Sequence, residues 1–279
     1  MKIFAARSRY RMRLTACLTG LVIAATVGAE PTTRAPFTLV VQPTHGVAMA
    51  PQGYQALADY LMLATGTHIS VVTPPNFLAH WETIRRDNGI DLVLDDAHFT
   101  DYRIQRRGYH VLVKVPGVIS YSLVASPGKR IKDPLSLTGK KVASFGPPGI
   151  GATRLNAMFP NPTRRPSIIE ISTTQQGLDL LQRKKVEAAM LPTSAVTDLV
   201  NTGRVIVLTT MEPTPHLALS ASPRVTKQTR ERIRAALLRA GESSNGRRML
   251  ENIGLSHFEP ASASVYANHA RLLRDVWGY

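Results

Sequence analysis

A glycine- and proline-rich turn at residues 146–153, Gly-Pro-Pro-Gly-Ile-Gly-Ala-Thr, is the segment of this chain best suited to chemistry. A nucleotide-binding P-loop would carry a lysine where Ala152 stands, so nucleotide phosphate chemistry is not expected. An apolar run precedes the turn and a helical pattern follows it, which predicts a helix start with unpaired amides that attract small anions. A tight turn that only closes a strand onto a helix is the alternative. The candidate anion-binding residues are Gly149, Gly151, Ala152 and Thr153.

Strands and helices are expected to alternate along the chain, since apolar runs alternate with amphipathic helical patterns. A first series has strands at 37–42, 68–73, 90–95 and 109–115 and helices at 51–65, 76–86 and 97–107. A second series has strands at 141–145, 168–171, 188–191 and 205–208 and helices at 151–158, 173–183 and 194–201. Further helices are expected at 226–240, 245–252 and 263–276.

Two extended segments, 118–126 and 216–221, connect the two series and predict a second lobe inserted into the first. The expected fold is therefore α/β and two-lobed. Each lobe is a mostly parallel sheet flanked by helices, and two crossing hinge strands join the lobes. The predicted boundaries are 30–122 for the first part of lobe 1, 123–215 for lobe 2 and 216–279 for the rest of lobe 1.

The N-terminus is typical of a secretory signal peptide. Its first thirteen residues hold five basic residues and no acid, and residues 14–28 form an uncharged apolar run. We predict cleavage before Glu30, so residues 1–29 are the signal and the mature chain is soluble in the periplasm. A membrane anchor is less favoured, because a span needs ~20 apolar residues. Cys17 is the only cysteine and lies in the signal, which excludes disulfides and thiol catalysis in the mature chain.

The charge of the mature chain points toward anionic partners. Removing the five basic residues of the signal from 34 leaves 29 against 19 acids, a net charge of +10. An exported protein with this charge favours anionic small molecules or an anionic membrane surface over nucleic acid. A merely solvated, soluble surface is the alternative, because the basic residues form no dense run.

Further site candidates lie in the loops that follow strands, because ligands of parallel sheets bind beyond the carboxyl ends of the strands. They are His45, Asp96, His98, Tyr121 and Thr193. Four of them have a structural alternative: a simple turn at His45, a helix cap at Thr193 and at one of the two aspartates Asp95 and Asp96, and packing between lobes at Tyr121. A metal site is not expected, since the aspartates and His98 are sequential at a helix start with no second ligand cluster. No cofactor is expected.

Several segments carry a family resemblance through their order along the chain. They are Leu57-Ala58-Asp59-Tyr60-Leu61, Asp91-Leu92-Val93, Tyr121-Ser122-Leu123-Val124, residues 135–143 (Leu-Ser-Leu-Thr-Gly-Lys-Lys-Val-Ala) and Lys185-Val186-Glu187-Ala188-Ala189. From Phe37 onward the chain resembles the periplasmic phosphate-, phosphite- and phosphonate-binding proteins, the solute receptors of ABC importers with the type 2 binding fold.

The resemblance implies a ligand clamped between lobes, a hinge near residues 120–124 and 216–219, and an ABC permease as partner. Phosphonate-binding members commonly hold the anion with a Ser-Thr-Ser-Gly turn. Here residues 149–153 replace it and lack the serines. The expected ligand is a small anion, phosphate- or phosphonate-like, or a carboxylate or sulfonate.

The hypothesis that the protein is an enzyme has less support than binding, because the chain has no Gly-x-Ser-x-Gly, His-Glu-x-x-His or Rossmann motif. Binding without catalysis is therefore the predicted function. The alternatives are a sensory receptor that partners a membrane histidine kinase and, less favoured, an exported hydrolase or metal-dependent enzyme.

Overall fold

The computed structural model describes residues 36–43, 51–128, 131 and 133–279. Its helices are α1 (Pro51–Thr65), α2 (Phe77–Arg86), α3 (Ala97–Arg107), α4 (Ile150–Ala157), α5 (Thr174–Gln182), α6 (Thr193–Asn201), α7 (Lys227–Leu238) and α8 (Ser244–Asn252). Its strands are β1 (Phe37–Val41), β2 (Ile69–Val72), β3 (Leu92–Asp95), β4 (His110–Lys114), β5 (Val118–Ile119), β6 (Tyr121–Ala125), β7 (Lys141–Ser144), β8 (Ser167–Glu170), β9 (Ala188–Pro192), β10 (Ile206–Thr210), β11 (Thr214–Pro215), β12 (Ala218–Ala221) and β13 (Glu259–Pro260).

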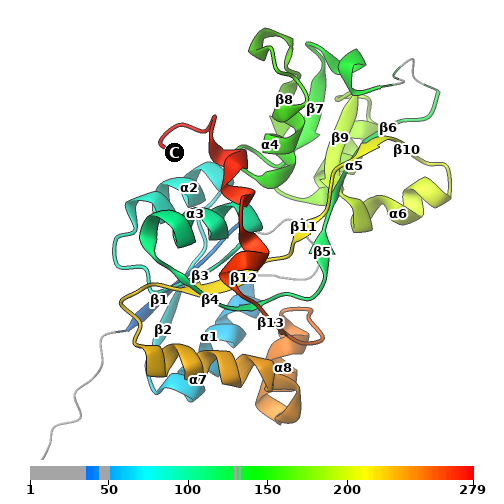
Figure 1. The fold of residues 1–279 in the computed structure, drawn as a ribbon. Helices are drawn as coiled ribbons and strands as arrows, with labels where there is room; N and C mark the ends of the chain where they lie inside the picture. The colour runs from blue at the N-terminus through cyan, green and yellow to red at the C-terminus, as the bar shows by residue number, and fades with distance from the viewer. Residues whose placement is uncertain (1–35, 44–50, 129–130, 132) are drawn as a thin grey trace, which may run out of the picture. The chain divides into compact units, whose positions relative to one another are not determined.

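The first sheet has six strands in the order β13-β4-β12-β3-β1-β2 (Figure 1). β1 pairs in parallel with β2 and β3, as the alternation of strands and helices predicts. β12 returns from the second series of elements and pairs antiparallel with both β3 and β4. The strands of the first series are therefore parallel to one another, but the sheet is mixed because the returning strand is inserted among them.

The second sheet has five strands in the order β10-β6-β9-β7-β8. β7 pairs in parallel with β8 and β9, whereas β6 enters antiparallel between β9 and β10. The predicted α/β class is confirmed. The expectation of mostly parallel sheets is corrected to mixed sheets, because β12 and β6 run against their neighbours and β13 pairs antiparallel with β4.

Both faces of the first sheet are covered by helices. Alternate residues of β1 are fully buried but belong to different apolar clusters, Leu39 and Val41 to one and Val40 to the other. The cluster of Leu39 includes side chains of α1, α7 and α8, and that of Val40 includes side chains of α2 and α3. Burial on two faces explains the continuous apolar runs of these strands. This burial also fixes the positions of the strand ends, from which the loops with the candidate site residues begin.

The two segments that connect the sheets pair with each other. β5 and β11 form a short antiparallel ribbon in which Thr214 lies opposite Ile119. The extended run predicted at 118–126 is thus divided between this ribbon and the second sheet, and the run predicted at 216–221 contributes β12 to the first sheet. The exact lobe boundaries remain a prediction. The predicted signal, residues 1–29, lies outside the described residues.

The predicted helix at 263–276 is wrong. Two short 3-10 turns, η4 (Ala263–Tyr266) and η5 (His269–Leu273), stand in its place. Asn268 between them has φ of 69°, in the left-handed region that a continuing α-helix cannot contain. The backbone N–H of Ala270 donates to Asp101 Oδ2 of α3 over 2.8 Å, which fixes this segment on α3. Among the described residues, no helix is both long and apolar enough to cross a membrane.

Candidate functional site

Side-chain caps distinguish the helices of this protein. Four helices have their first turn capped by a side chain: α2 by Asn76, α5 by Thr173, α7 by Thr226 and α8 by Ser243. In contrast, α3, α4 and α6 have Asp96, Gly149 and Pro192 at the cap position, and none of these residues caps the helix with its side chain. These three helices follow β3, β7 and β9, strands in the interior of the sheets, and ligands of α/β sheets bind beyond such strand ends.

The starts of α3 and α4 therefore present backbone donors that the helices do not use. The first intrahelical bonds run from Thr100 N to Asp96 O, over 3.0 Å, and from Thr153 N to Gly149 O, also over 3.0 Å. The amides of the three residues that begin each helix have no intrahelical acceptor. These residues, 97–99 and 150–152, are all buried. Buried amides need partners, and an oxyanion would supply them.

A histidine joins the two helix starts. His98 Nε2 lies 2.9 Å from the carbonyl oxygen of Pro148. Because a carbonyl can only accept, Nε2 carries the proton and Nδ1 is left as an acceptor. His98 Nδ1 is buried and has no hydrogen-bond partner among the described residues. Burial, against the Pro148 hydrogen bond, lowers the pKa of His98 to about 4, so the ring is neutral near pH 7.

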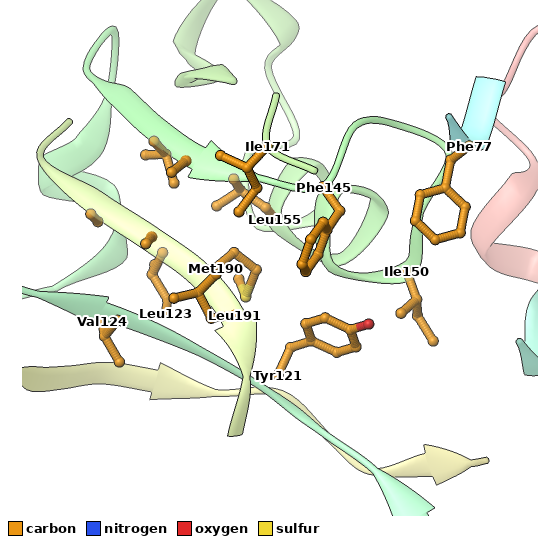
Figure 2. Packing of buried hydrophobic residues seen from close by; sticks show 14 of the residues in the cluster. Phe77, Tyr121, Leu123, Val124, Phe145, Ile150, Leu155, Ile171, Met190 and Leu191 are labelled. Atoms are coloured by element: carbon orange, nitrogen blue, oxygen red, sulfur yellow. The ribbon is translucent and has the colours of Figure 1, made fainter. Parts of the chain in front are cut away.

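Close packing explains two glycines at the start of α4. A Cβ atom on Gly149 would lie 2.8 Å from Cδ2 of Phe77, the first residue of α2. A Cβ on Gly151 would lie 3.1 Å from Cδ1 of Tyr121. Figure 2 shows the Tyr121 ring directed from β6 toward the start of α4. A Cβ on Gly149 would force a neighbour to move, and one on Gly151 would press on the Tyr121 ring, so the predicted turn is also a contact point for other elements.

Asp96 occupies the cap position of α3 without capping it. Its backbone N–H donates to Gln42 Oε1 over 2.8 Å, but its side-chain Oδ2 is buried and has no partner among the described residues. Burial and then the charge of Asp95 raise the pKa of Asp96 to about 7, against the lowering effect of a hydrogen bond between the side chains of Gln42 and Asp96. Burial and the charge of Asp96 also raise the pKa of Tyr121, which stays a neutral phenol.

The preceding residue, Asp95, has the opposite environment. Its carboxylate accepts hydrogen bonds from Arg103 Nη2 over 2.7 Å and from Thr100 Oγ1 over 2.9 Å, and it pairs with His80 Nε2 over 3.1 Å. Burial alone would raise the pKa of Asp95, but the Arg103 charge and these bonds lower it to about 2. Sequence reasoning missed Arg103 and His80. Arg103 is one of several arginines on α3, and nothing in the local pattern distinguishes it as a buried partner of Asp95.

The side-chain hydroxyl groups of two predicted site residues, Thr153 and Thr193, form hydrogen bonds within the protein. Thr153 Oγ1 donates to Ile150 O over 2.9 Å, and Thr153 lines a cavity of 340 Å³ that Arg271 also lines. Thr193 Oγ1 lies 3.0 Å from both Ser120 Oγ and Ser122 Oγ, so it ties α6 to the crossing segment and does not cap the helix.

The structure thus brings Asp96, His98, Tyr121, Gly149 and Gly151 together, with Ala152 buried beside them. His45 lies outside the described residues, and ligand contact by each candidate stays a prediction. Among the described residues, no group of three or more His, Cys, Asp or Glu side chains could hold a metal ion.

Comparison with known sequences gives one family match. The model of a family described as "ABC transporter, phosphonate, periplasmic substrate-binding protein" matches residues 39–266, most of the chain. No curated protein matches the chain significantly.

Solved structures share the fold at low sequence identity. XAC2383 from Xanthomonas citri, bound to ATP, has a TM-score of 0.68 and 13% identity, covering 87% of this chain and 100% of its own. PhnD1 from Prochlorococcus marinus, in complex with methylphosphonate, has a TM-score of 0.66 and 12% identity, covering 85% and 97%. A binding protein component of an ABC phosphonate transporter from Pseudomonas aeruginosa has a TM-score of 0.64 and 12% identity, covering 85% of each chain. These similarities identify the two-lobed type 2 periplasmic binding fold.

Proposed function

The chain belongs to the family of periplasmic substrate-binding proteins of phosphonate ABC transporters, and we propose that it captures a small oxyanion of phosphonate type and delivers it to an importer. The observation that carries the proposal is the pair of uncapped helix starts, α3 and α4, with their buried amides. The site replaces the family's serine hydroxyls with backbone donors, so an oxyanion remains a suitable ligand.

The electrostatics of the two helix starts support an anion. A negative charge at a helix N-terminus gains about 0.3–1 kcal/mol when exposed and up to about 2 kcal/mol when partly buried. Two such ends are linked here by the hydrogen bond between His98 and Pro148. An anion that contacts both helix starts binds more tightly when the two helix starts are close together than when they are apart. This difference in affinity favours hinge closure around the ligand.

The proposed partner is an ABC permease in the inner membrane. The family description names an ABC transporter and offers no support for a histidine kinase as partner. Binding and release complete the proposed function, with no covalent bond made or broken.

Thermal unfolding with added ligand tests the proposal. The mature chain is heated with methylphosphonate, phosphate, methanesulfonate, acetate and ATP, the last because XAC2383 was solved with it. A ligand at 100 times its dissociation constant adds about 2.7 kcal/mol to the free energy of unfolding. We expect at least one oxyanion to raise the melting temperature.

A matched pair of variants locates the binding. Gly151→Asp places a carboxylate at the start of α4, whereas Gly241→Asp places one where a Cβ meets no atom within 4 Å. Gly151→Asp should abolish the oxyanion-induced shift, and Gly241→Asp should retain it. No shift from any oxyanion, or an unchanged shift in folded Gly151→Asp, would refute the proposal.

A further inference from the structure

A cavity of about 340 Å³ lies between α4 and the segment of residues 269–279. Thr153, Asn156 and Ala157 line it from one face of α4, because residues three and four positions apart share a face of a helix. Residues 150–152, whose amides carry the proposed oxyanion site, do not line this cavity. The cavity is therefore a separate candidate site, and the proposed function leaves it without a role.

Segment 269–279 forms a fixed wall of the cavity, because it is fastened to helices of the first sheet. Figure 1 shows this segment in red beside α3, and Leu273 is fully buried in the apolar cluster that contains Trp81 of α2 and Phe99 of α3. Trp81 Nε1 also donates to the carbonyl oxygen of Trp277 over 2.8 Å. The wall is held by contacts within the protein, which suits a preformed small-molecule site.

The apolar side of the cavity presents an exposed tryptophan. Trp277 lines the cavity and is 72% exposed, yet the guanidinium carbon of Arg85 lies 4.4 Å from the centroid of its ring. Leu78, in the first turn of α2, is 51% exposed and lines the cavity with the half-buried Leu272 and Val276. Large apolar side chains that gather at the surface mark places where another molecule binds. These four lining side chains are suited to cover an apolar group.

The polar side of the cavity carries charges of both signs. Arg165, Arg271 and Asp275 line it, and none of the three forms an ion pair within the described residues, although Arg271 and Asp275 are four residues apart. Arg165 Nε donates a long hydrogen bond, 3.5 Å, to the carbonyl oxygen of Phe159. Two guanidinium groups are suited to bind a carboxylate, and the Asp275 carboxylate is suited to bind an ammonium group.

We propose that this cavity binds a single free α-amino acid with an apolar side chain. The carboxylate of the amino acid bonds to the guanidinium groups of Arg165 and Arg271, and its ammonium group bonds to Asp275. Its side chain packs against Trp277 and the neighbouring aliphatic residues. The inference does not rest on the proposed function, because the helix-start amides that carry the oxyanion site take no part in it.

The charges and the size of the cavity favour an amino acid over other small molecules. A simple organic anion would place its negative charge beside Asp275 with no cation of its own, and a simple amine would lie beside two guanidinium groups. A zwitterion satisfies both signs at once. The volume lies near the lower end of the range for ligand pockets, roughly 300–1,000 Å³, which favours one amino acid over a peptide.

Calorimetric titration of the mature chain with L-phenylalanine tests the inference. Two analogues separate the contributions of the two charges: 3-phenylpropanoate lacks the ammonium group, and 2-phenylethylamine lacks the carboxylate. Each analogue should bind at least about tenfold more weakly than L-phenylalanine, because each leaves a charged partner on the protein unused.

Tryptophan fluorescence locates the bound L-phenylalanine, since the sequence contains two tryptophans, Trp81 and Trp277. Trp81 is fully buried, whereas the Trp277 ring is exposed at the cavity. Covering the Trp277 ring with ligand should shift its emission to shorter wavelength, and Trp277→Leu should lose this shift.

Three variants of segment 269–279 identify the charged partners. Arg271→Gln and Asp275→Asn should each weaken the binding of L-phenylalanine about tenfold. Arg274→Gln is the matched control, because Arg274 is exposed on the same segment and does not line the cavity. This control should bind L-phenylalanine as wild type does.

Competition with methylphosphonate keeps the two proposals apart, since saturating methylphosphonate should not displace L-phenylalanine. If no oxyanion binds but L-phenylalanine does, only the proposed function fails. The inference is overturned if L-phenylalanine does not bind, if methylphosphonate displaces it, or if either analogue binds equally well. Equal losses of affinity in Arg271→Gln and Arg274→Gln would overturn it too.

Discussion

Replacing Arg103 with methionine should strongly destabilise the protein, because it removes the main partner of a buried charge. Arg103 and Asp95 are both fully buried, and the guanidinium also donates to Ser220 Oγ over 2.9 Å. Removing one partner of a buried ion pair costs about 3–5 kcal/mol, since the other charge is left uncompensated. For a chain of this size, that loss lowers the melting temperature by roughly 6–20 °C.

The pH dependence of the free energy of unfolding provides an independent test of the same ion pair. The pKa of Asp95 in the folded protein is lowered from 3.8 to about 2, so the carboxylate contributes roughly 2 kcal/mol above pH 3.8. That contribution is lost as the pH falls from 3.8 toward 2. Wild type and Arg103→Met should therefore differ most near pH 7 and converge in acid.

Urea unfolding followed by tryptophan fluorescence measures the effect, because Trp81 is buried and packs on Phe99 of α3. The double variant Asp95→Asn/Arg103→Met should be more stable than Arg103→Met alone, since the unpaired charge is gone. Arg232→Met, at an exposed position on α7, is the control and should change stability by less than about 0.5 kcal/mol. A loss below 1 kcal/mol in Arg103→Met, or no recovery in the double variant, would refute the reasoning.

Two further substitutions test the packing and capping around the site, both by urea unfolding. Gly149→Ala places a Cβ 2.8 Å from Phe77 and should cost about 1–3 kcal/mol, whereas Gly241→Ala, which meets no atom within 4 Å, should be nearly neutral; equal stability of the two variants would contradict the close approach. Asn76→Ala removes the cap bond to Ala79 N, 2.8 Å long, and should cost about 1 kcal/mol, so a change below 0.3 kcal/mol would show that this cap contributes nothing.

Local pattern was enough to predict most of the elements. The helices at 51–65 and 97–107 were predicted with the bounds that the structure has, because apolar spacing and flanking turn residues agree there. The segment 263–276 was mispredicted because its composition is compatible with a helix, while Asn268 takes a left-handed conformation that nothing in the pattern requires. The insertion of β6 and β12 against their neighbours depends on the path of the whole chain, which the αβ alternation does not encode.

The candidate site was predictable as a set of loops but not as a set of contacts. Strand order placed Asp96, His98 and residues 149–153 at the carboxyl ends of strands, and the structure joins them through Pro148. Thr153 looked like a ligand hydroxyl, yet it bonds to its own helix, as threonine side chains in helices often do. Whether an aspartate caps a helix depends on its rotamer and tertiary partners, so sequence left the choice between Asp95 and Asp96 open.

The structure explains why the two adjacent aspartates, Asp95 and Asp96, differ. Asp95 ends β3 and reaches Arg103, His80 and Thr100, so its pKa falls to about 2. Asp96, one residue later, is buried with its Oδ2 atom unpartnered among the described residues, and burial outweighs the Gln42 side-chain hydrogen bond, so its pKa rises to about 7. Two adjacent carboxyl groups with separated pKa values are suited to separate roles. The hydrogen bonds of Asp95 tie the end of β3 to Thr100 and Arg103 of α3 and to His80 of α2, and we expect this network to hold the start of α3 in place.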